Sequence, residues 1–130
     1  MKVSIGPYPK SDKPRKINIR IDNYDTWSMD HTLAYIIHPM LIQLKETKHG
    51  SPWVDDEDVP EELQSTSAPP KENDWDIDDN HHTRWDWVLN EMIWAFEQHI
   101  EDDCSFEEKI NERKRNGFRL FGKYYQGLWD

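Results

Sequence analysis

The chain has 130 residues, of which 35% are hydrophobic and 32% are charged, and its formal net charge is −10 at pH 7. This acidity excludes generic binding to duplex DNA, because the chain repels phosphate groups. The single cysteine excludes an internal disulfide, and no apolar run reaches the roughly 20 residues that span a bilayer. We therefore expect one domain, residues 1–130, that meets no membrane and has an aromatic core supplied by seven Trp, five Tyr and four Phe.

The first predicted element is a small β-ribbon within residues 1–24. Ile17, Ile19 and Ile21 alternate with polar residues, which is the pattern of a half-buried strand. A second strand at residues 3–5 can pair with it through the proline-rich turn between them.

A first helix is predicted over residues 28–49, with Ser28 as its N-cap. Pro39 lies inside it and lacks the amide hydrogen that would bond to the carbonyl of Tyr35, so we expect a kink or a break there. The apolar residues gather on one side of the helix and predict its buried face, which comprises Met29, Leu33, Ile36, Ile37, Met40 and Leu44.

Residues 51–80 contain four prolines and eleven carboxylates and predict a long acidic loop with one helical turn at Pro60 to Leu63. A structureless segment of this length is unusual inside a domain. It is either pinned by Trp53 and Trp75, or functional, or mobile.

Two further helices are predicted over residues 83–103 and 105–126. Thr83 and Ser105 are N-cap candidates, because each precedes an acidic residue by three positions. Gly117 indicates a close helix approach or a fraying point. The predicted apolar stripes are Trp85, Val88, Leu89, Met92, Phe96 and Ile100 on one helix, and Phe106, Ile110, Leu120, Phe121, Tyr124 and Leu128 on the other. The fold class is α+β, mainly α, with three principal helices, a small N-terminal β-ribbon and a long acidic loop.

The helix over residues 83–103 carries a second face, opposite its apolar stripe, formed by Trp87, Glu91 and Trp94. One interpretation is that the aromatic end of the last helix, including Phe118 and Trp129, packs on this Trp pair. The other is a platform of Trp rings flanking a carboxylate, suited to stacking a base or anchoring a partner.

Histidines on the first helix are further candidates for binding a partner, namely His31 and His49. His31 and His38 lie about 10.5 Å apart along the helix axis, so they cannot share one metal ion. Glu46 and His49 have the i, i+3 spacing of carboxylate-bridged metal sites, which also need acids from another helix, such as Glu91. An ordinary solvated helix face is the alternative.

The last helix is basic, with a net charge of +5 over residues 109–123. We interpret this charge as docking against the acidic remainder of the chain, with an RNA or phosphate patch as the alternative. No phosphate-binding glycine loop, CxxC pair, HExxH or GxSxG motif is present, so the sequence favours a protein without catalytic activity.

Five segments resemble a group of small uncharacterised proteins of tailed bacteriophages: Ile5–Tyr8, Asp25–Ala34, Lys48–Pro52, Glu91–Gln98 and Asn116–Asp130. That group has no assigned activity, so the resemblance implies no catalytic residue. It implies expression in an infected bacterium, with the protein in the cytoplasm of the host cell.

We therefore expect a non-enzymatic phage accessory protein that needs no cofactor and binds a host or phage protein, or a small nucleotide, in host modulation or counter-defence. Two alternatives stay open. One is a metal-dependent nucleotide phosphohydrolase, in which Glu46, Glu91 and Glu97 hold Mg²⁺ or Mn²⁺ near His49. The other is a minor component of the virion.

Overall fold

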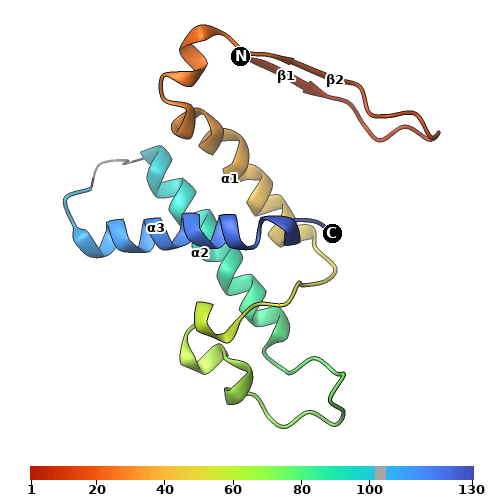
Figure 1. Ribbon diagram of the computed structural model, residues 1–130, viewed down its shortest axis with the longest axis vertical. Coiled ribbons are helices and arrows are strands. Elements are labelled where there is room, and N and C mark those ends of the chain that lie inside the picture. The colour runs from red at the N-terminus through yellow and green to blue at the C-terminus, as the bar shows by residue number, and fades with distance from the viewer. Residues whose placement is uncertain (102–104) are drawn as a thin grey trace. The chain divides into compact units, whose positions relative to one another are not determined.

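A computed structural model describes residues 1–101 and 105–130, which form two compact units, Met1–Leu33 and Ala34–Asp130 (Figure 1). The fold is α+β and mainly α, as the sequence predicts, with 57% of residues in helices and 6% in strands. Cys104 and the predicted helix end at residue 103 lie outside the described residues. Within the described ranges, no helix combines the length and apolar character needed to cross a bilayer.

The predicted N-terminal ribbon is confirmed as two antiparallel strands, β1 (Lys2–Ile5) and β2 (Ile17–Arg20). Every residue of both strands is exposed. A short 3-10 helix, η1 (Asn23–Thr26), follows the ribbon, and its Asp25 carboxylate accepts a hydrogen bond from the Asp22 amide at 2.7 Å.

Helix α1 (Met29–Thr47) runs without interruption through Pro39, so the predicted break is wrong. Its buried residues are Ala34 and Leu41, two turns apart on one side of the helix. The predicted buried face is therefore rotated from the real one: the small Ala34 side chain makes the buried contact, and larger apolar residues stay outside. Those exposed side chains are Met29, Leu33, Ile36 and Met40.

Helix α2 (His81–Glu101) carries the core stripe that the sequence predicts, since Trp85, Val88, Leu89, Met92 and Phe96 are all buried. The helix begins two residues before the predicted cap Thr83. The start is fixed instead by Asp78, whose backbone carbonyl accepts the His81 amide at 3.1 Å and whose carboxylate accepts the Asn80 amide at 2.9 Å.

Helix α3 (Glu108–Lys123) lies across α2 (Figure 1) and ends in a short 3-10 helix, η5 (Tyr125–Gly127). It begins after Glu107, so Ser105 is not its N-cap. Phe106, predicted to belong to the buried stripe, precedes the helix and is fully exposed, whereas Leu120 and Tyr124 are buried as predicted.

The acidic loop is an ordered segment containing three single-turn helices, η2 (Asp56–Asp58), η3 (Glu61–Leu63) and η4 (Ser65–Ser67). The η3 turn is the predicted one. Trp53 and Trp75 do not pin the loop, because their side chains are 67% and 80% exposed.

Gly117 marks the closest approach of α3 to α2, one of the two alternatives that the sequence left open. A Cβ atom at this position would lie 2.4 Å from the Cβ of Ala95 and 2.8 Å from the carbonyl oxygen of Glu91. Real side chains do not approach so closely, so the two helices pack at a distance that only glycine permits.

The Gly117→Ala variant should lower the free energy of unfolding by about 1 to 3 kcal/mol, because the added methyl group pushes the helices apart. Gly122→Ala is the matched control on the same helix, since its Cβ would have nothing within 4 Å. That control should be neutral or stabilise by up to about 1 kcal/mol through helix propensity. Urea denaturation measures both, and equal stability of the two variants would contradict the close packing.

Candidate functional site

The second face of α2 is occupied by a side chain of α3. The Arg113 guanidinium donates hydrogen bonds to both carboxylate oxygens of Glu91, at 3.0 and 2.7 Å, and lies 3.9 Å from the centre of the Trp94 ring. Such bidentate pairing and stacking suit the planar guanidinium. The ring face that a base would use is therefore already covered by Arg113.

Trp87 is half-buried and packs against the hydrophobic core. The aromatic residues predicted to seal the Trp pair lie elsewhere. Phe118 makes edge contacts with Phe96 and His99, at ring separations of 5.1 and 5.5 Å, and Trp129 is 74% exposed. Arg113 covers the Trp94 ring because the same α3 side chain also pairs with the Glu91 carboxylate on α2.

The remaining predicted site residues are dispersed. His31 is a half-buried residue of the unit Met1–Leu33, whereas Glu46 and His49 belong to the other unit. Glu46 is exposed at the end of α1. His49 binds Asp130 twice, through its backbone amide at 2.6 Å and its Nδ1 atom at 2.7 Å. These residues hold the chain end beside the end of α1.

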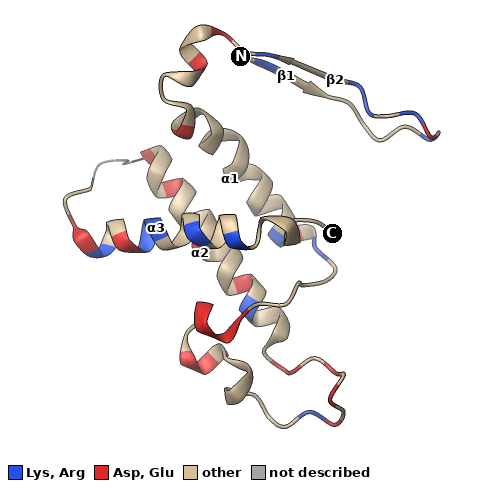
Figure 2. Ribbon diagram, in the orientation of Figure 1, with Lys and Arg blue, Asp and Glu red and all other residues tan. Residues whose placement is uncertain are grey.

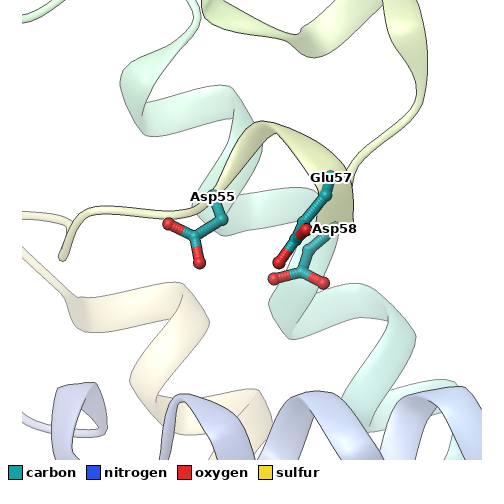
Figure 3. Close-up of side chains that lie close together, drawn as sticks. All are labelled: Asp55, Glu57 and Asp58. Atoms are coloured by element: carbon teal, nitrogen blue, oxygen red, sulfur yellow. The ribbon is translucent and has the colours of Figure 1, made fainter.

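A cluster of three carboxylates lies around the η2 turn: Asp55, Glu57 and Asp58 (Figure 3). Their nearest oxygen atoms all lie within 4.8 Å of one another, the only such group among the residues described. The Lys123 ammonium group sits among them, at 2.9 Å from Asp55, 3.1 Å from Glu57 and 2.6 Å from Asp58. A cation of the chain itself thus neutralises the cluster.

Asp58 is the centre of this cluster, with a side chain that is only 2% exposed. Burial opposes its ionisation, but hydrogen bonds from Lys123, Tyr124 and Arg119 outweigh burial and lower its pKa. Hydrogen bonds to Asp58, Asp55 and Glu57 raise the pKa of Lys123. Burial and the hydrogen bond to Asp58 raise the pKa of Tyr124 to about 12. The basic helix α3 therefore docks on the chain's own acids, as predicted (Figure 2).

A second ion pair fixes the far end of the loop. Arg84 of α2 donates to both oxygens of Asp78, at 2.8 and 2.6 Å, and to the carbonyl of Leu63 at 3.2 Å. The Arg84 and Asp78 side chains are 2% and 8% exposed. Hydrogen bonds from Arg84 lower the pKa of Asp78 from its ordinary value of 3.8 to about 2, against the opposing effect of burial. This pair, and not the Trp residues, pins the loop.

An apolar groove of about 600 Å³ lies between α1 and the end of α3. Its size falls within the range of about 300 to 1,000 Å³ typical of ligand pockets. Met40 and Tyr125 line it and remain 67% and 63% exposed. The other lining residues are Ile37, Pro39, Leu41, Gln43, Leu44, Thr47, Phe121 and Leu128. The prediction that Met40 is buried is wrong, whereas Leu44 is partly buried and packs against the core as well as lining the groove.

Comparisons with protein-family models, with curated proteins and with solved structures found no match to this chain. The resemblance to phage proteins stays a prediction.

Asp78→Asn should cost about 3 kcal/mol of stability at pH 7, because it leaves the buried Arg84 charge without its carboxylate. A lowered pKa in the folded state means that ionised Asp78 stabilises the fold above about pH 4 and that this contribution is lost as the pH falls towards 2. The penalty of the variant should therefore shrink over that interval. Thermal melts from pH 7 to pH 2 test this, with the exposed neighbour Asp79→Asn as control. A penalty independent of pH would contradict the ion pair.

Lys123→Ala removes the cation from the carboxylate cluster and should lower stability by about 1 to 3 kcal/mol. Because the three acids then lack their ammonium partner, millimolar Ca²⁺ or Mg²⁺ should raise the melting temperature of this variant more than that of the wild type. Lys109→Ala, an exposed lysine on the same helix, is the control and should behave like the wild type. An equal response of wild type and Lys123→Ala would show that Lys123 does not occupy the cation position.

Proposed function

We propose that the protein is a non-enzymatic binding protein, and that its groove between α1 and the end of α3 receives apolar side chains of a partner protein. The groove carries this proposal because it combines a volume of about 600 Å³ with the exposed Met40 and Tyr125 side chains. Aromatic residues and Met are enriched in protein interfaces, and Met adapts its shape to different partners. In the setting that the phage resemblance implies, the partner is a bacterial host protein or another phage protein.

The polar groups around the groove are few, which favours a protein over a nucleotide as the ligand. Gln43 and Thr47 are the uncharged polar residues of the lining, and no Lys or Arg contributes to it. A nucleotide phosphate needs cationic or amide donors. At the Trp platform, a base would have to displace Arg113 from both Trp94 and Glu91.

The phosphohydrolase alternative gains no support from the geometry. Its helix-borne acids are separated: Glu91 is paired with Arg113, and Glu46 and Glu97 are exposed. The acids that do gather, around Asp58, hold the Lys123 ammonium. The virion alternative makes a different prediction about where the protein is found, and the capture experiment below separates the two.

Met40→Glu and Tyr125→Glu should each abolish capture of the partner, because each places a charge in an apolar contact that must lose its water. Tagged wild type and variants are expressed in the infected bacterium, and soluble and virion fractions are separated before quantitative mass spectrometry of the captured proteins. Tyr35→Glu is the matched control, since Tyr35 lies on the same helix, is 59% exposed and does not line the groove.

Circular dichroism melts accompany every variant, and a residue this exposed should change the free energy of unfolding by no more than about 0.5 kcal/mol. Specific enrichment that Tyr35→Glu keeps and both groove variants lose supports the proposal. If the folded groove variants retain all partners of the wild type, the groove is not the binding site. Recovery of the protein mainly in purified virions would favour the structural alternative.

A further inference from the structure

The N-terminal ribbon has one apolar and one polar face. In its register Val3 pairs with Ile19 and Ile5 with Ile17. Directly opposed residues of an antiparallel pair share a face, so these four β-branched side chains form a continuous patch. They are 45% to 62% exposed. The other face carries Lys2, Ser4, Asn18 and Arg20.

Such a ribbon lacks the packing that stabilises a sheet. Two-stranded hairpins are marginally stable in water, and they gain stability when a hydrophobic face packs on another surface. The first 20 residues contain six Lys or Arg and one acidic residue, in a chain whose net charge is −10. Four of the six cations, at positions 10, 13, 15 and 16, lie in the connection between the strands, next to the Ile5–Ile17 pair of the apolar face. A surface that covers both the apolar face and this connection is therefore expected to combine apolar side chains with carboxylates.

The acidic loop, residues 51–80, has this chemistry. It contains eleven carboxylates and a single lysine, and the contrast with the basic ribbon is visible in Figure 2. Among its acids it presents Trp53, Trp75 and Ile77, which are 67%, 80% and 44% exposed. Because the Arg84–Asp78 pair already orders the loop, docking costs little conformational entropy there.

We infer that the apolar face of the ribbon docks on the Trp-bearing acidic loop of a second copy of this chain. Each copy carries both surfaces, so two copies can exchange ribbons in a closed twofold dimer with two equal contacts. The contact uses neither Met40 nor Tyr125, so it is independent of the groove. Nucleic acid fits the ribbon less well, because phosphates would meet only its charges and leave the apolar patch in water.

Ile17→Asp tests the ribbon, and Asn18→Asp is its matched control, because it adds the same charge at the next residue on the other face. Trp75→Ala tests the loop. Sedimentation equilibrium of the purified full chain should show a dimer for the wild type and Asn18→Asp. Ile17→Asp and Trp75→Ala should each raise the dimer dissociation constant by more than about tenfold. Raising the salt concentration should also weaken the wild-type dimer, because opposite charges contribute to the contact.

Mixing the two defective variants identifies which surfaces meet. Ile17→Asp keeps an intact loop and Trp75→Ala an intact ribbon, so the mixture should recover one of the two contacts and associate more tightly than either variant alone. If the ribbons of two copies packed on each other instead, Trp75→Ala would remain fully dimeric. That result would overturn the inference.

Carbodiimide cross-linking of a mixture of ¹⁴N and ¹⁵N wild-type protein shows whether the contact joins two chains. Lysines of residues 1–20 should couple to carboxylates of residues 51–80 in peptides of mixed isotope content. A wild type that stays monomeric at all concentrations, or couplings found only within one chain, would overturn the proposed dimer. A shift to a larger species on adding duplex DNA, without self-association of the protein, would do so as well.

Discussion

The approach of α3 to α2 at Gly117 is the constraint on which residues 34–130 depend. A glycine facing Ala95 brings the two helix backbones so close that no Cβ atom fits between them. At this distance Leu120 is fully buried against the α2 stripe, and Arg113 reaches Glu91 one turn along the helix. The C-terminal end of α3 lies at the η2 turn, where Lys123 donates a hydrogen bond to Asp58. The absence of a side chain at Gly117 thus permits both the apolar and the ionic contacts of α3.

Ionic contacts in turn compensate for a modest hydrophobic content. Burying one member of an ion pair alone is costly, but a buried carboxylate that accepts several hydrogen bonds remains ionised and fixes its donors in place. Asp58 gathers Lys123, Arg119 and Tyr124, and Asp78 holds Arg84 with two bonds. Both acids belong to the loop, which also buries Val54 and Val59 in the core. The loop is therefore held at two ionic points and by these two apolar side chains.

Local patterns predicted the elements whose periodicity was complete. Alternating isoleucines at 17 and 19 gave the ribbon, and the five core residues from Trp85 to Phe96 repeat at helical spacing. Helix α1 was misjudged because a helical wheel ranks faces by hydrophobicity. Which side of α1 is buried depends instead on the size of the side chains that fit against the core, here Ala34 and Leu41. Met40 lies outside the core and lines the groove.

The pairing of acids with cations could not be predicted from the sequence, for a different reason. Asp58 and Lys123 are 65 residues apart, and many equivalent acids surround each possible partner. Pairing of this kind is determined by the tertiary fold, which a single sequence does not display. The basic character of the ribbon, by contrast, was available from the sequence. The net charge of the whole chain does not reveal this basic character, because the acidic loop outweighs the six cations of the first 20 residues.

Three acids that the fold gathers or buries are paired with cations of the same chain. A catalytic carboxylate or cation must remain available to a substrate, whereas Glu91, Asp58 and Asp78 each hold a cation of the chain itself. The described residues also expose three apolar surfaces: the ribbon face, the loop Trp residues and the groove around Met40. Contiguous exposed apolar patches in a highly charged protein mark contact surfaces. Because different residues form these surfaces, the proposed self-association and the proposed partner capture use different parts of one small chain.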